Sequence, residues 1–303
     1  MLEWIKSILP RGAKDTPLFL LTKITSYADY TKHLEKCKSD DLIDMSFEKS
    51  LLSGQRGDFF FESYCYVCRQ PVGFLVDFKW SYEIDGVLMP NWRERLVCPG
   101  CHLNNRMRAT VHIFEQEYHP NSDSKLYVTE QTTPLYNWFK NNFAHIYGSE
   151  FLGDSVAYGS CNDKEIRNED VTRLSFPDEN FDYILSFDVF EHIPGYAEAF
   201  KECFRCLKPD GVLYFSVPFV KTSEKNIVRA CISSNGEVKH LLPPEYHGDP
   251  LRREGCLAFY HFGWEMLDEL RAIGFEEVSA LLYWSSDYGY LGGEQIIFTA
   301  KKP

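Results

Sequence analysis

The chain has 303 residues, of which 44% are hydrophobic and 25% charged, a balance typical of a globular protein with a sizeable core. Its net charge of −12 argues against a protein that binds the phosphates of nucleic acids through an overall positive charge. No apolar run approaches the roughly 18 residues of a membrane span, and Leu18–Leu21 is too short for a signal-peptide core. We therefore expect a cytoplasmic protein.

The first 58 residues carry no pattern that points to chemistry. Apolar and charged residues are mixed between Ile24 and Leu52, which predicts one or two helices. We interpret residues 1–58 as an N-terminal helical arm. Such an arm packs on the rest of the chain or forms a contact in a homo-oligomer.

Residues 59–120 form a second predicted unit, marked by cysteines. The pair Cys65 and Cys68 is followed, after 29 intervening residues, by the pair Cys98 and Cys101. Two C-x-x-C turns can close a tetrahedron of thiolates around one Zn²⁺, and a closed four-cysteine site has a structural role. The alternative is reduced thiols or disulfides, which a cytoplasmic setting disfavours. We predict a small zinc-ribbon-like domain, with a linking helix after its last ligand.

The third predicted unit, residues 121–303, contains a strand, a helix and a second strand. Tyr183–Val189 is an apolar run rich in β-formers, and the apolar residues after it recur at the spacing of a helix face. Lys208–Gly211 should end this helix, and Gly211–Phe219 reads as another buried strand. A βαβ unit of this kind predicts a parallel sheet, and ligands bind at the carboxyl ends of its strands.

Two segments of this unit resemble a known family. FDYILSFDVFEHI (residues 181–193) and EAFKECFRCLKPDGVLYFSVPF (residues 198–219) are similar to the second half of class I S-adenosylmethionine-dependent methyltransferases. The resemblance covers roughly Ser124–Lys301. It implies an α/β fold with a Rossmann-like seven-stranded sheet, whose last strand is antiparallel, and S-adenosylmethionine as the cofactor.

The resemblance also implies cofactor-binding residues, with one departure from the family. Glu130, Gln131 and Thr132 stand where the family has a glycine-rich turn; Thr132 or Thr133 could cap the next helix, with Pro134 in its first turn. Glu130 could receive the ammonium group of the cofactor. The further residues expected at the cofactor are Glu150 for the ribose hydroxyls, Asp170 and Val171 for the adenine, and Asp188 at the end of its strand.

Histidines near the same strand ends are the candidates for catalysis. His192 follows an acidic residue at the end of a strand, and we take it as the first choice for a general base, before His247 and His261. An insertion at residues 220–258 holds His240, His247 and Asp249, which with His261 could form a base or a second metal site. Ordinary hydrogen bonding within the loop is an equal alternative for each.

Three functions fit the sequence. The leading one is an S-adenosylmethionine-dependent methyltransferase that methylates an oxygen of a small acceptor, such as a sugar, a glycoconjugate precursor or another metabolite. The second is a scaffold that keeps the fold without the activity, because the glycine-rich turn is missing. The third is a nucleic-acid methyltransferase that docks through its zinc ribbon, which the acidic composition disfavours.

Overall fold

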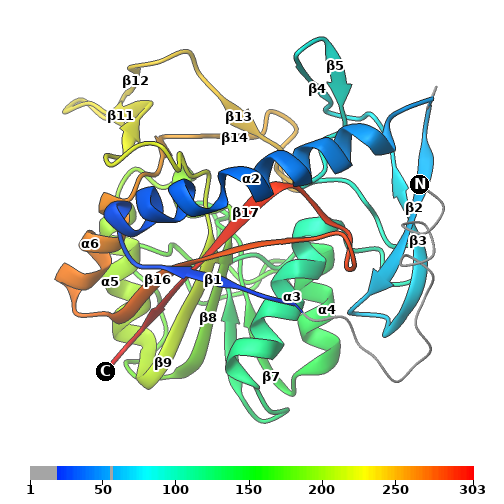
Figure 1. Ribbon diagram of the computed structural model, residues 1–303. Helices are drawn as coiled ribbons and strands as arrows, with labels where there is room; N and C mark the ends of the chain where they lie inside the picture. Colours follow the sequence, from blue (N-terminus) through cyan, green and yellow to red (C-terminus); the bar gives the residue numbers. More distant parts are fainter. Residues whose placement is uncertain (1–18, 55–56) are drawn as a thin grey trace. The chain divides into compact units, whose positions relative to one another are not determined.

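The structure is a computed structural model that describes residues 19–54 and 57–303, and its contacts divide the chain into two compact units (Figure 1). Within the described residues, unit 1 holds residues 19–22, Lys32–His119 and Leu282–Ile296. Unit 2 holds Lys23–Thr31, Pro120–Leu281 and Ile297–Pro303. No helix among the described residues is long and apolar enough to span a bilayer.

A seven-stranded sheet is the centre of the fold, with the strand order β1-β16-β17-β9-β8-β6-β7. Strand β6 pairs in parallel with β7 and β8, and β8 pairs in parallel with β9. The last strand, β17, runs antiparallel to β9, so the predicted fold class is confirmed. The strands are β1 (Thr22–Ile24), β6 (Lys125–Val128), β7 (His145–Gly148), β8 (Phe181–Phe187), β9 (Leu207–Ser216), β16 (Glu276–Ser285) and β17 (Tyr290–Lys301).

The seventh strand comes from a segment for which the sequence predicts only helices. Strand β1 has three residues, of which Ile24 is buried, and it forms the edge of the sheet beside β16. Three residues are too few for an alternating pattern to show. The predicted helical region follows as one helix, α2 (Tyr27–Leu51).

Unit 2 also contains α4 (Pro134–Asn142), η1 (Phe190–His192), α5 (Tyr196–Cys206) and α6 (Glu265–Ile273). Of the two threonines predicted to cap this helix, Thr132 or Thr133, it is Thr133 that caps α4: its side chain accepts a hydrogen bond from the backbone N–H of Tyr136 at 3.1 Å. Helix α5 ends at Cys206 and β9 begins at the next residue. The helix thus ends before Lys208–Gly211, as expected, but the strand begins earlier than the expected Gly211, and these four residues form an irregular start of β9 with Asp210 at φ 64°.

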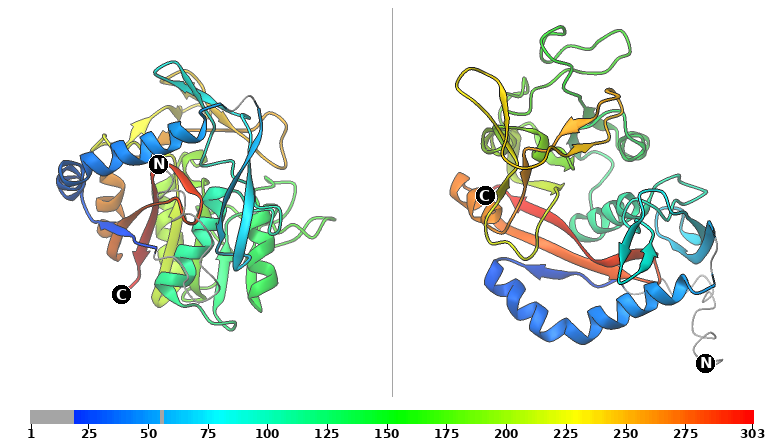
Figure 2. Two further views of the ribbon diagram at one scale, coloured as in Figure 1. Left: turned by 45° about the vertical axis from the view of Figure 1, so that its right-hand side comes forward. Right: turned by 90° about the horizontal axis from the view of Figure 1, so that it is seen from above.

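The predicted insertion folds into short two-stranded ribbons. They are antiparallel pairs of β10 (Ile227–Val228) with β15 (Tyr260–His261), β11 (Ala230–Ile232) with β12 (Val238–His240), and β13 (Tyr246–His247) with β14 (Cys256–Leu257). Figure 2 shows this segment, in yellow to orange, as loops outside the main sheet. The backbone N–H of Phe259 donates to the carbonyl of Glu191 at 2.7 Å, which ties the insertion to the residues that follow β8.

Unit 1 contains two hairpins and the linking helix. Its elements are β2 (Phe59–Cys65), β3 (Gln70–Val76), β4 (Tyr82–Ile84), β5 (Val87–Met89) and α3 (Asn105–Tyr118). Buried Phe74, Trp92 and Leu96 pack around Cys65 and Cys98. Leu291 completes this core, so the hairpin between β16 and β17, which the sequence assigns to the third unit, lies in unit 1.

Candidate active site

The carboxyl ends of the parallel strands bring several predicted residues to one edge of the sheet. Glu130 follows β6, Glu150 follows β7 and Asp188 follows β8. The end of β8 is joined to the end of β9, because the Asp188 N–H donates to the Ser216 carbonyl and the Ser216 hydroxyl donates to Asp188 Oδ1, both at 2.9 Å. Asp188 has φ 56°, a left-handed conformation that turns the chain sharply after the strand.

Glu150 organises the loop that replaces the glycine-rich turn. Its Oε1 accepts hydrogen bonds from the backbone N–H groups of Gln131 and Thr132 at 2.8 and 2.9 Å, and from the Thr132 hydroxyl at 2.7 Å. Glu150 Oε2 receives no hydrogen bond from any residue that the structure describes. Glu130 Oε1 accepts from the Thr133 hydroxyl at 3.0 Å. The structure therefore brings Gln131, Thr132 and Glu150 together, with one carboxylate oxygen left for a ligand.

Asp170 lies beside this group. The Glu169 N–H donates to the Glu150 carbonyl at 3.1 Å, which places the start of the Asp170 turn next to the end of β7. Asp170 Oδ1 accepts from the Thr172 N–H at 3.0 Å and from its hydroxyl at 2.6 Å, and Oδ2 accepts from Arg173 Nε at 3.0 Å. These bonds fix the carboxylate, and Val171 beside it is half-buried.

Three ionisable residues meet just after β8. The Glu191 side chain is fully buried. Its Oε1 lies 3.5 Å from His192 Nε2 and 3.3 Å from Nδ1 of His247, which belongs to β13 of the insertion. The two imidazole rings stand nearly perpendicular, with centroids 4.9 Å apart. The structure thus joins His192 and His247, and it adds Glu191, the acidic residue before His192, for which the sequence predicts no role.

A second carboxylate connects the cluster to His261. Glu245 Oε1 lies 3.1 Å from His247 Nε2 and 3.2 Å from His261 Nε2, while Arg229 pairs with Glu245 Oε2 at 3.0 Å. The pKa of His247 is raised, and the contact with Glu191 is the largest cause. Burial lowers this pKa in part, and Glu245 raises it further. Burial alone would raise the pKa of Glu245, but His247, His261 and Arg229 outweigh it and lower that pKa. His247 is therefore placed between two acids.

Two other residues considered for this group lie outside it. His240 is exposed in β12, opposite Ala230. Asp249 bonds within its own loop: Oδ1 accepts from the Leu251 N–H at 2.7 Å, and Oδ2 accepts from the Cys256 thiol at 3.2 Å. The structure therefore contradicts the hypothesis that His240, His247, Asp249 and His261 form one metal site.

The four cysteines gather in unit 1. Their Sγ atoms all lie within 4.8 Å of one another, with 3.9 Å between Cys65 and Cys101 and 3.7 Å between Cys68 and Cys98. The first pair spans the turn between β2 and β3. A Cβ atom at Gly100 would stand 2.9 Å from Cys68 Sγ, so the second turn requires glycine there. Burial, and then the neighbouring Cys65, raise the pKa of the Cys68 thiol to about 12.

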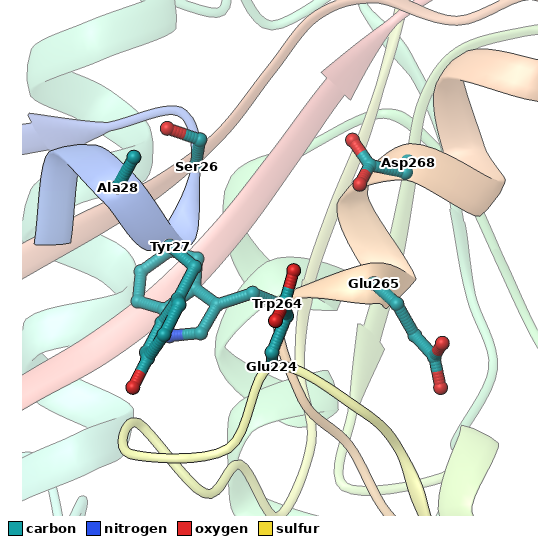
Figure 3. A pocket seen from close by; sticks show the side chains of 7 residues that line it. All are labelled: Ser26, Tyr27, Ala28, Glu224, Trp264, Glu265 and Asp268. Atoms are coloured by element: carbon teal, nitrogen blue, oxygen red, sulfur yellow. The ribbon is translucent and has the colours of Figure 1, made fainter.

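A surface pocket in unit 2 is made of other residues. Its wall is formed by the start of α2, the start of α6 and Glu224 (Figure 3). The side chains that line it are Ser26, Tyr27, Ala28, Glu224, Trp264, Glu265 and Asp268. Three of them are acidic and none is a predicted site residue, so the pocket is separate from the groups that follow β6, β7 and β8.

Comparison with known proteins agrees with this arrangement. Residues 132–215, from the first loop to the end of β9, match a family described as "Methyltransferase domain". Residues 132–215 are therefore similar to a methyltransferase domain. A protein of Mycolicibacterium smegmatis described as "Probable S-adenosylmethionine-dependent methyltransferase" is 39% identical over 54 residues. That match spans 18% of this chain and only 21% of the relative.

Two solved methyltransferase structures are loosely similar to about two thirds of the chain. An S-adenosylmethionine-dependent methyltransferase of Mesorhizobium loti is 14% identical with a TM-score of 0.42, covering 67% of this chain and 100% of that one. The 1,6-didemethyltoxoflavin-N1-methyltransferase of Burkholderia thailandensis is also 14% identical, with a TM-score of 0.37, covering 65% of this chain and 77% of that one.

Proposed function

We propose that the protein transfers a methyl group from S-adenosylmethionine to an oxygen of a small hydroxyl-bearing acceptor, such as a sugar, a glycoconjugate precursor or another metabolite. The observation that carries this proposal is a cluster of three histidines and two carboxylates. Glu191 and His192 come directly after β8, while Glu245, His247 and His261 come from further along the chain and meet them there. Methylation of a hydroxyl oxygen releases the hydroxyl proton, and a positioned histidine can accept it.

The residues at the strand ends fit the cofactor by their chemistry. Glu150 would hold the ribose hydroxyls through Oε2, because its Oε1 is already committed to the loop. Glu130, Gln131 and Thr132 would face the amino-acid end of the cofactor. Asp170 and Val171 would face the adenine, and Asp188, in the turn after β8, would also line the cofactor site. When bound, S-adenosylmethionine supplies a methyl group activated by a positively charged sulfur.

The protein's part in the reaction is to orient the acceptor and to accept its proton. The His192 Nδ1–H donates to the Leu257 carbonyl at 2.8 Å; a carbonyl can only accept, so Nε2 is the basic nitrogen. His261 Nε2 lies 3.2 Å from Glu245 Oε1, and this contact holds the imidazole ring in place. The insertion supplies His247 and, with its ribbons, the surface that selects the acceptor.

We infer that the four cysteines hold a structural Zn²⁺. The sulfur atoms are close enough to surround one ion, and four cysteine ligands leave no open position for catalysis. The zinc would stabilise the small hairpins of unit 1, whose own core is limited to a few buried residues.

The test of the proposed function is a methyl-transfer assay with isotopically labelled S-adenosylmethionine and a panel of free and nucleotide-linked sugars. We expect label in an ether linkage of one acceptor class. His192→Ala should lower kcat more than it weakens cofactor binding, and His240→Ala, an exposed histidine of the same insertion, is the matched control. Equal losses of turnover and cofactor affinity for His192→Ala would instead assign that residue a structural role.

A further inference from the structure

We propose that Glu191, His192 and His247 form a binding site for one divalent transition-metal ion. One ligand atom from each residue lies within 4.8 Å of the others, so a single ion could contact all three. Two of the ligands follow β8 directly, and the third comes from β13 of the insertion. This site lies in unit 2 and shares no residue with the four-cysteine cluster of unit 1.

The strongest evidence is the state of Glu191. Its side chain is completely buried, and neither carboxylate oxygen accepts a hydrogen bond from the residues that the structure describes. A buried carboxylate without hydrogen bonds is costly unless a cation compensates it. Among the residues that the structure describes, its cationic partners are the two imidazoles, at 3.3 and 3.5 Å. Both face the same oxygen, which leaves Oε2 without a partner from this part of the chain.

The histidines are oriented as metal ligands usually are. His192 donates its Nδ1–H to the Leu257 carbonyl at 2.8 Å, and this bond fixes the ring with the lone pair of Nε2 directed toward Glu191. His247 presents Nδ1 to Glu191 at 3.3 Å, while its Nε2 lies 3.1 Å from Glu245. A ligating imidazole with its second nitrogen on a carboxylate is a frequent arrangement in metal sites. Each histidine therefore has one nitrogen held by the protein and one left for the ion.

The donor set decides the class of metal. Two imidazoles and one carboxylate suit Mn²⁺, Fe²⁺, Co²⁺ or Zn²⁺, whereas Mg²⁺ and Ca²⁺ prefer oxygen ligands. Three protein ligands leave coordination positions open, in contrast to the closed set of four thiolates in unit 1.

This inference rests on the proposed function for its role in the reaction. An acceptor hydroxyl bound at an open position of the ion would have its pKa lowered, because the cation stabilises the alkoxide. His261, paired with Glu245 beside His247, is then the residue left to take the proton. Under this assignment His192 and His247 hold the ion, and His261 acts as the base.

The site can be tested without cofactor or acceptor. Full-length protein would be stripped of metal and given one equivalent of Zn²⁺ per chain, which four thiolates hold more tightly than two imidazoles and a carboxylate do. This zinc-filled protein would be titrated with Co²⁺, and bound metal would be counted and followed by visible absorption. We expect about one additional equivalent of Co²⁺, with the weak bands of nitrogen and oxygen ligation and without the intense sulfur-to-cobalt band. Glu191→Gln and His247→Ala should each weaken Co²⁺ binding by at least about 10-fold.

His240→Ala is the control, since this histidine is exposed in the same insertion and should leave Co²⁺ binding unchanged. Circular dichroism would establish that each variant is folded. The proposal would be overturned if the zinc-filled protein failed to bind Co²⁺, or if Co²⁺ bound only with a thiolate band. Equal Co²⁺ binding by the wild type and both ligand variants would also overturn it. None of these outcomes depends on methyl transfer, so the metal site and the proposed reaction can fail separately.

Discussion

Thr132 donates both its backbone N–H and its hydroxyl to one oxygen of Glu150, at 2.9 and 2.7 Å. The loop that follows β6 is thus shaped by an acid that follows the neighbouring strand, β7. A glycine-rich turn lets backbone approach a ligand through the absence of side chains. Here the amides of Gln131 and Thr132 are gathered on a carboxylate that also offers its second oxygen to a ligand.

Glu150→Gln should loosen this loop and weaken cofactor binding together. A neutral amide accepts more weakly than a carboxylate, so we expect S-adenosylhomocysteine to bind about 10-fold less tightly, equivalent to about 1.4 kcal/mol. Calorimetric titration measures the effect. Asp163→Asn, at an exposed acid of a nearby loop, is the control and should bind as wild type does. Unchanged binding in Glu150→Gln would remove Glu150 from the cofactor site.

The sequence predicted the parts of this site that depend on local pattern. The capping of α4 by Thr133 could be read from residue type and spacing, and so could the two cysteine pairs. The core of the sheet followed from the βαβ pattern around β8 and β9. These features depend on neighbours in the chain, which a sequence displays directly.

Other features depend on contacts between distant segments. His247 reaches Glu191 from 56 positions further along the chain, and the partner of His192 is a carbonyl in β14. No local pattern indicates such contacts. The short β1 strand was missed for a similar reason, because three residues acquire their strand conformation from the neighbouring β16.

Cys98→Ser should release the metal of unit 1. A serine hydroxyl is a much poorer zinc ligand than a thiolate, and structural zinc sites contribute directly to folding. We expect about one zinc per chain in the wild type, close to none in the variant, and a lower unfolding temperature. Cys161→Ser, an exposed cysteine outside the cluster, should retain the metal. A Cys98→Ser variant that still holds about one zinc per chain would contradict the zinc assignment.

Glu191→Gln should have opposite effects on stability with and without metal. When no ion occupies the site at Glu191, the substitution removes a buried charge that has no hydrogen bond, so without Co²⁺ we expect stabilisation by about 1–3 kcal/mol. Added Co²⁺ should raise the unfolding temperature of the wild type through binding to the native state, and should raise that of Glu191→Gln much less. Thermal unfolding of zinc-filled protein, with and without Co²⁺, checks both. A destabilised variant that still responds to Co²⁺ would contradict the assignment.

His112 should make the stability of unit 1 depend on pH. Burial lowers the pKa of His112 to about 3, and its ring is stacked between Phe19 and Tyr66. The unfolded chain takes up a proton near its usual pKa of about 6.5, and the folded chain does not, so stability is present above that pH and is lost as the pH falls.

The expected loss between about pH 7 and pH 5 is about 2 kcal/mol. His112→Phe keeps a stacking ring but cannot be protonated, so its stability should fall less over this interval. Urea unfolding of both proteins at the two pH values gives the comparison. Parallel losses in the two proteins would show that His112 does not carry the pH dependence.

The central claim is that the strand ends of unit 2 bind S-adenosylmethionine although the glycine-rich turn is absent. The most direct test is calorimetric titration of the metal-filled, full-length protein with S-adenosylhomocysteine, after removal of any copurified ligand. The account predicts saturable binding of about one equivalent, weakened in Glu150→Gln and in Asp170→Ala. A folded protein that takes up no S-adenosylhomocysteine would contradict it, and would favour a scaffold built on the methyltransferase fold.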